Sequence, residues 1–293
     1  MADNVVVSPP SGPGGATVAT DNIGGVMHQR VKLVLGNDGV SDGDVSTTNA
    51  MPVTGTVHAQ GMPIGASYLR RFGVNDSVGA AHELVDSVGA ATPYMPLTAV
   101  TVEAVSSSNA DNVAGAGALT ILVTGLDANF DQKTSTITLT GTTPAVDSTF
   151  IRVTKVEVAT VGTYGGSNLG TITIRASGGT TFLTIPVGYG QSFSSHFCVP
   201  RGYYGAVTGA NLSIDSNKTV DVIVRARDHA NVTVAPFGPA SIVQYYAGVV
   251  GSTHYDYEPP ILINPYTDVY ITAATPTSTA QVSVEYWGYI APL

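Results

Sequence analysis

Short runs of Val, Ile and Thr, each bounded by Gly, Asn, Asp or Pro, repeat along most of this chain from residue 105 onward. In the runs 135–140 and 220–227, apolar and polar residues alternate, which places them on opposite faces of a strand. The runs recur at about 8–12-residue spacing, and no helical run of ten residues separates them. The pattern therefore predicts an all-β fold of antiparallel strands rather than a parallel α/β sheet.

These runs predict one module over residues 105–293, a β-sandwich that is jelly-roll-like. The strands are expected near 119–124, 134–140, 150–160, 169–176, 181–187, 191–199, 203–214, 219–228, 240–250, 260–264, 267–274 and 280–290. The stretch 199–204 divides the module into two halves. One sandwich is favoured because neither half has a clean amphipathic set of strands, and two domains are the alternative. In the last strand, Trp287 or its flanking tyrosines are expected to anchor the core.

Residues 1–60 are expected to be an N-terminal arm followed by a β-hairpin anchor. The segment 1–22 is rich in Pro, Gly and Ser, which predicts no fold of its own. The run 26–35 indicates a strand, and the Asp-Gly turn at 36–39 suits a tight hairpin. Because a two-stranded hairpin is marginal alone, this one is expected to dock on another particle component. The residues expected to make that contact are Val26, Arg30, Val31 and Leu33.

Residues 61–104 have the least regular pattern. Their short segments are separated by Gly and Pro, which predicts an extended connector. A turn or two of helix over 79–88 is the alternative, because a loose apolar stripe recurs there.

The composition favours a surface that is neutral and rich in hydroxyl groups. Charged residues are 11% of the chain, against roughly 25% in a typical soluble domain. A surface with few long charged side chains loses less entropy when it is covered, which suits packing into an assembly. Secreted and cell-surface β proteins share this composition and are the alternative.

Charge and cysteine content exclude several classes of partner. The net charge of −9 and scattered basic residues disfavour nucleic acid, and no apolar run approaches the roughly 20 residues that span a membrane. The first residues lack the basic start and apolar core of a signal peptide, so synthesis in the cytosol is expected. The single Cys198 excludes an internal disulfide and is expected to be a buried strand residue.

No arrangement of residues predicts catalysis, a metal or a cofactor. The six histidines lack metal-chelating spacings, and no phosphate-binding loop or nucleophile motif occurs. Ser195 and His196 are adjacent, so on a strand they would point to opposite faces. Asp127, Asn129 and Asp131 resemble the start of a calcium loop but lack its later ligands, which favours a hairpin connection. The chain is therefore expected not to be an enzyme, with a carbohydrate-cleaving carboxylate pair as a weaker alternative.

A tyrosine-rich segment is the candidate for recognition. Its members are Tyr245, Tyr246, Tyr255 and Tyr257. Aromatic rings that carry hydroxyl groups suit contact with a host-surface glycan or a protein partner. The favoured alternative is that these rings pack over an edge of the sandwich.

Two stretches of the chain resemble structural proteins of tailed bacteriophages. The first opens VSSSNADNVAGAGALTILVTGLDANFDQ and contains IPVGYGQS, and the second is ATDNIGGVMHQRVKLVLGNDG. The resemblance covers about residues 105–290 and 18–40. It implies a virion location after assembly in the host cytoplasm, a jelly-roll-like sandwich and a homotrimer.

On this basis we expect a capsid decoration or head-fibre protein. Its expected partners are other virion proteins, either the major capsid protein or tail and neck components. A tail or baseplate component is the first alternative, and a module that binds a receptor or glycan is the second.

Overall fold

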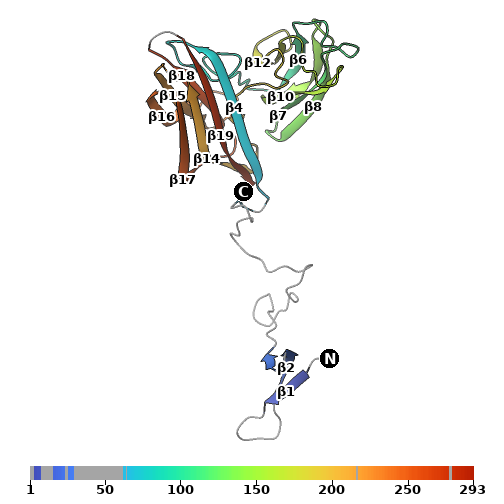
Figure 1. Ribbon diagram of the computed structural model, residues 1–293, viewed down its shortest axis with the longest axis vertical. Coiled ribbons are helices and arrows are strands. Elements are labelled where there is room, and N and C mark those ends of the chain that lie inside the picture. The colour runs from blue at the N-terminus through green and yellow to red at the C-terminus, as the bar shows by residue number, and fades with distance from the viewer. Residues whose placement is uncertain are drawn as a thin grey trace. The chain divides into compact units, whose positions relative to one another are not determined.

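The computed structural model describes residues 3–7, 16–23, 26–29, 62–63, 65–215, 217–276 and 279–293 (Figure 1). Over these residues the chain forms strands β1 to β19 and no helix, which confirms the all-β prediction. It follows that this part of the chain has no helix able to cross a membrane. The chain divides into two units, Met1–Thr56 and Val57–Leu293.

The first unit contains a three-stranded antiparallel sheet of order β1-β2-β3. The strands are β1 (Asp3–Val7), β2 (Ala16–Ile23) and β3 (Val26–Gln29). β1 and most of β2 come from the segment 1–22, and the β-branched runs of these two strands pair with each other. The predicted hairpin turn at 36–39 lies outside the described residues. So do Arg30, Val31 and Leu33, whereas Val26 begins β3.

The second unit contains two β-sandwiches. The first sandwich packs a sheet of order β10-β7-β8 against a sheet of order β12-β11-β6-β9. Its strands are β6 (Val100–Ser106), β7 (Ala118–Leu126), β8 (Gln132–Thr138), β9 (Ala145–Phe150), β10 (Arg152–Val161), β11 (Ile172–Ala176) and β12 (Thr181–Ile185). Aliphatic side chains with Phe150 and Phe182 fill the space between its sheets.

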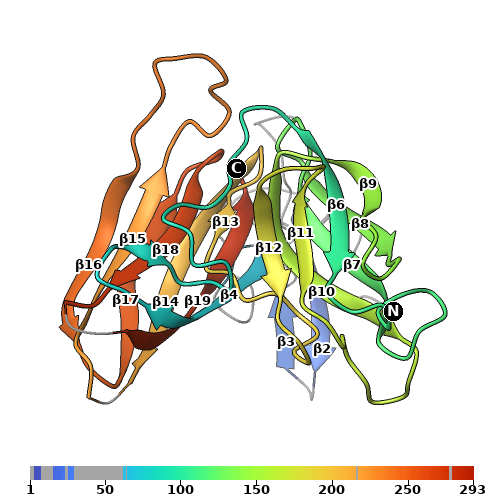
Figure 2. The ribbon, with the colours of Figure 1, turned by 90° about the horizontal axis from the view of Figure 1, so that it is seen from above.

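The second sandwich packs a sheet of order β17-β14-β19-β4 against one of order β13-β18-β15-β16, and β5 pairs with β18 (Figure 2). Its strands are β4 (Ser67–Val78), β5 (Glu83–Leu84), β13 (Phe197–Cys198), β14 (Tyr203–Ile214), β15 (Val220–Arg227), β16 (Ser241–Val249), β17 (Ser252–Ile263), β18 (Asp268–Ala274) and β19 (Ala280–Pro292). Along β19 buried and more exposed residues alternate, as the sequence predicts.

The preference for a single sandwich over residues 105–293 is wrong, because the two sandwiches have separate hydrophobic cores. The later half completes its second sheet with β4, which comes from the region expected to be a connector. In β4 Leu69, Gly73 and Asn75 are buried, whereas Arg70 and Phe72 are exposed. Neither half looked complete in sequence because this strand lies before residue 105.

The segment 61–104 therefore supplies structure rather than a link. The helix considered over 79–88 does not form, and these residues make turns around the short strand β5. Gly73 on β4 lets this segment lie close, since a Cβ there would stand 2.0 Å from the carbonyl oxygen of Val85. The strand expected over 191–199 is shorter in the structure. It is β13, in which Phe197 and Cys198 pair with β18.

Trp287 is not the core anchor of the last strand. Its neighbour Tyr286 is buried in the core and donates a hydrogen bond to the carbonyl oxygen of Ser195 at 3.0 Å. Trp287 lies on the outer face of its sheet and stacks on His254 with 5.5 Å between ring centroids. Gly209 on the neighbouring strand makes room, because a Cβ there would stand 2.5 Å from the indole ring.

Candidate functional site

The predicted tyrosine cluster lies on β16 and β17, the edge strands of the two sheets of the second sandwich. Tyr246 is buried, its ring packs on Tyr255 at 4.4 Å between centroids, and its hydroxyl group is hydrogen-bonded to that of Tyr257. Tyr245 is 50% exposed and donates a hydrogen bond to the carboxylate of Asp221 at 3.0 Å. The four rings therefore do not form one surface, because three pack against the core and one faces out.

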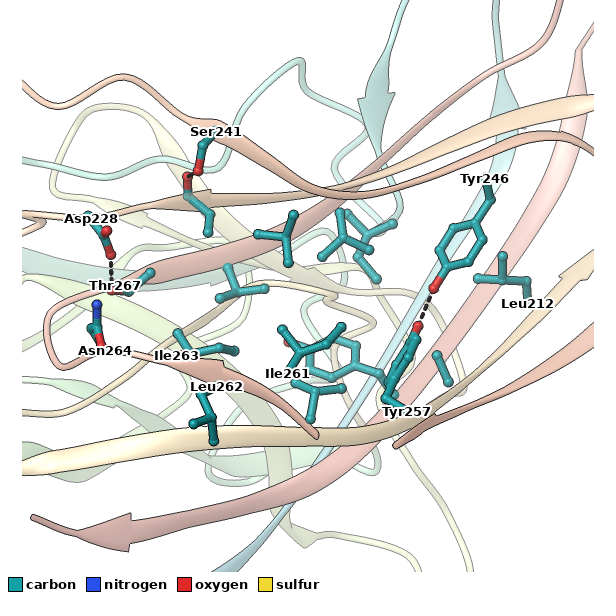
Figure 3. Close-up of a pocket in the computed structure, with 18 residues that line it drawn as sticks. Leu212, Asp228, Ser241, Tyr246, Tyr257, Ile261, Leu262, Ile263, Asn264 and Thr267 are labelled. Carbon is teal, nitrogen blue, oxygen red and sulfur yellow. Dashed lines mark hydrogen bonds between the residues drawn. The ribbon is translucent and has the colours of Figure 1, made fainter. Parts of the chain in front are cut away.

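Tyr246 and Tyr257 close one end of a cavity between the two sheets (Figure 3). The cavity has a volume of about 200 Å³. At its other end Thr267 donates a hydrogen bond to Asp228 at 2.6 Å, beside Asn264. The walls between the two ends are mainly aliphatic and come from β14, β15, β17 and β18.

The cavity is suited to hold an apolar body rather than to move protons. Burial raises the pKa of Tyr246, and its hydrogen bond with Tyr257 raises it further. Burial also raises the pKa of Tyr257. Both hydroxyl groups are therefore neutral at ordinary pH. The carboxylate of Asp228 lies at the opposite, exposed end.

A buried ion pair joins the two sandwiches. Arg152, the first residue of β10, donates two hydrogen bonds of 2.8 Å to the two carboxylate oxygens of Asp268, the first residue of β18. Its remaining nitrogen donates to the carbonyl oxygens of Pro96 and Ile151 at 2.9 and 2.8 Å. Both side chains are almost fully buried. Such a bidentate pair fixes the two strand ends against each other.

His196 completes this cluster, with its Nε2 at 3.0 Å from Asp268 Oδ1. Burial alone would raise the pKa of Asp268, but the hydrogen bonds from His196 and Arg152 outweigh it and hold that pKa well below its usual range. Cys198 is also buried, and desolvation raises the pKa of its thiol well above the usual value. The thiol is therefore no nucleophile, although Cys, His and Asp lie together here.

Ser195 and His196 bond to different groups, as their adjacent positions predict. The Ser195 hydroxyl lies 3.3 Å from the backbone N–H of Ile271 and 3.4 Å from its carbonyl oxygen, while the His196 ring contacts Asp268. No Ser–His dyad forms between them.

The Asp127 loop is a hairpin connection, as favoured from the sequence. Asp127 Oδ1 accepts hydrogen bonds from the backbone N–H groups of Asn129 and Asp131 at 2.8 and 3.0 Å. Asp131 is paired with Arg201 through bonds of 3.0 and 2.6 Å. Its carboxylate thus already has a counter-charge. The described residues contain no group of three or more His, Cys, Asp or Glu side chains suited to a metal ion.

A second buried carboxylate holds the loops of the first sandwich together. Asp111 accepts a hydrogen bond of 2.6 Å from the hydroxyl of Ser106. It also accepts backbone N–H groups of Ala118, Leu169 and Gly170 at 2.8 to 2.9 Å. All the partners belong to the loops and strand ends around it, so its role is structural.

Sequence reasoning missed Arg152, Asp268 and Asp111. Of these, Asp268 has a recognisable signal, because it is the single charged residue of the strand β18. A charge buried in this way is expected to have a partner. What the sequence could not supply is the identity of that partner, since 116 residues separate the two.

Comparison with known proteins adds no further information. No protein-family model matches this chain, and neither a curated protein nor a solved structure matches it significantly. Its function is therefore inferred from its own residues.

Proposed function

We propose that this protein is a non-enzymatic structural component of a tailed-bacteriophage virion, a capsid decoration or head-fibre protein. The observation that carries the proposal is the buried Arg152–Asp268 pair, which joins two β-sandwiches into one body suited to project from a particle. The sequence resemblance and the low content of charged residues support the same role.

In this proposal the N-terminal 60 residues dock on the particle. The residues assigned to that contact remain Val26, Arg30, Val31 and Leu33. The partner is the major capsid protein or a tail or neck component, and the projecting body assembles as a homotrimer. A stable contact of this kind buries about 1,600 Å² in total.

The test is deletion of residues 1–60, which leaves β4 and both sandwiches complete. Full-length and truncated proteins are mixed with particles that lack the protein, and bound protein is measured after sedimentation. We expect the truncated protein to stay folded and soluble but to remain unbound. If it sediments with particles as the full-length protein does, the anchoring role is wrong.

A three-dimensional reconstruction of the particle distinguishes a capsid location from a tail or baseplate location. A tail or baseplate component would appear as density at that end of the particle instead of on the capsid. The receptor-binding alternative at the tyrosine cluster has less support, because Tyr246 is buried and Tyr255 and Tyr257 pack against the core.

A further inference from the structure

A groove lies between the two sandwiches, where residues of β4 and β10 come together. Its volume is about 500 Å³, and it is lined by residues of both sandwiches. The lining includes Arg71 and Phe72 on β4, Thr154 and Lys155 on β10, and Ser194. Basic, hydroxyl and aromatic groups thus converge on one space.

Arg71 is a buried charge that the protein does not neutralise. Its Nε–H is buried and has no hydrogen-bond acceptor, and its Nη2 makes one long bond of 3.4 Å to the Thr154 hydroxyl. Its guanidinium lies over the ring of Phe197 at 5.2 Å. Within the described part of the chain, no carboxylate lies within ion-pair distance of it.

Three other arginines show the arrangement that a carboxylate partner gives. Arg152, Arg175 and Arg201 are each paired with a carboxylate at 2.6 to 2.8 Å. Burying a guanidinium without a counter-charge is costly, and arginine cannot escape by losing its proton. An unpaired arginine at a groove is therefore a place where an anion from outside binds favourably.

The surrounding groups limit the charge of that anion. Lys155 is paired with Glu157 at 2.6 Å, and Arg70 is paired with Glu285. Only Arg71 is left with an uncompensated charge among these three, and the Glu285 carboxylate also lines the groove. One negative charge fits this balance better than the two of a phosphate, and a carboxylate matches the planar guanidinium.

The rest of the groove favours a sugar as the carrier of that carboxylate. The ring of Phe72 is 39% exposed, and it contacts Phe193, which in turn contacts Tyr189. Gln191, Ser192 and Ser194 supply amide and hydroxyl groups on the same wall. An exposed aromatic face beside neutral hydrogen-bonding groups is complementary to a sugar ring.

We propose that this groove binds an acidic sugar of the uronic-acid type, with its carboxylate on Arg71 and its ring against Phe72. This binding goes beyond the proposed structural role and places recognition away from the tyrosine cluster. Because the whole chain carries a net charge of −9, attraction of an anion must come locally from Arg71.

The test is calorimetric titration of the purified full-length protein with glucuronate, and with glucose as the neutral match. We expect saturable binding of glucuronate and none of glucose. Arg71→Met, which keeps an apolar chain over Phe197, is expected to weaken glucuronate binding about tenfold or more. Arg201→Met, which removes an exposed arginine elsewhere, is the control and is expected to bind as the wild type does.

A second variant keeps the test decisive if Arg71→Met does not fold. Phe72→Ser changes an exposed side chain of the groove and is expected to weaken glucuronate binding several-fold. The proposal is overturned if glucuronate does not bind the wild type, or if Arg71→Met or Phe72→Ser binds it unchanged. If N-acetylglutamate binds as tightly as glucuronate, the assignment to a sugar is wrong. The titration contains no particles, so its outcome is separate from that of the sedimentation test.

Discussion

The two sandwiches reach a similar architecture by different chain orders. The first is made from one continuous stretch, β6 to β12, which supplies the buried residues of its core. The second combines β4 and β5, which precede that stretch, with β13 to β19, which follow it. The first sandwich is thus an insertion within the second. The chain enters it after β5 and leaves it before β13, and both of these strands belong to the second sandwich. The comparison shows why the second sandwich could not be recognised from the later half of the sequence alone.

Buried charges follow the same division. Asp111 holds loops within the first sandwich, whereas the Arg152–Asp268 pair crosses between the two. The second sandwich has an apolar cavity of about 200 Å³ between its sheets. These differences predict unequal responses to mutation.

The largest effect is expected at the crossing pair. Asp268→Asn leaves Arg152 buried without a counter-charge, so the free energy of unfolding is expected to fall by about 3–5 kcal/mol. Urea denaturation measures this loss. Replacing both partners, with Arg152→Met and Asp268→Leu together, is expected to lower the free energy of unfolding by less than Asp268→Asn does. A loss below about 1 kcal/mol for Asp268→Asn would show that the pair does not hold the sandwiches together.

A smaller loss, restricted at first to one sandwich, is expected at Asp111. Asp111→Ala leaves four donors without their acceptor and is expected to lower the free energy of unfolding by about 3 kcal/mol. Hydrogen exchange is expected to rise in the loops around 107–117 and 165–171. Asp256→Ala, at an exposed position of the second sandwich, is the control with little expected change. Equal losses for the two variants would contradict the buried role of Asp111.

Alkaline pH is expected to destabilise the fold through tyrosines of the second sandwich. Burial raises the pKa of Tyr246, Tyr257 and Tyr286, all in its core or against it. The folded state thus favours neutral tyrosine, so this stability is complete below the unfolded pKa of about 10 and is lost as pH rises beyond it. The expected loss is about 1.4 kcal/mol per pH unit for each such tyrosine. Unfolding at pH 8 and pH 11 measures it, and an unchanged stability would refute it.

The smallest effect tests the difference in packing. Val243→Leu adds volume beside the cavity of the second sandwich and is expected to change stability by less than about 1 kcal/mol, in the stabilising direction. Ala104→Leu adds volume at a fully buried position in the core of the first and is expected to destabilise by about 1–3 kcal/mol. Thermal unfolding of both variants gives the comparison. The account fails if Val243→Leu is the more damaging of the two.

Local pattern was sufficient to predict most strands of the later half. The strand expected at 203–214 coincides with β14, and those near 219–228 and 240–250 lie within two residues of β15 and β16. These segments alternate or are bounded by clear turns, so their form is set by neighbours in sequence. The run 67–78 was missed because its two arginines and interior Gly73 weaken the alternation that identifies a strand.

The candidate sites could be predicted only in part. The tyrosines were found from their residue type, but which way each ring faces depends on the pairing of β16 and β17 with different sheets. Arg71 follows Arg70 directly in the sequence, yet the groups around its guanidinium come from segments more than 80 residues away. Contacts over such separations are set by topology, which a single sequence does not fix.

The central claim is that the inserted first sandwich and the second form one rigid body. The most direct measurement is urea unfolding of the wild type followed by two probes. Fluorescence of Trp287, the single tryptophan, reports the second sandwich, and hydrogen exchange at β7 and β10 reports the first. The account predicts coincident transitions in the wild type. Separate midpoints in the wild type would contradict it.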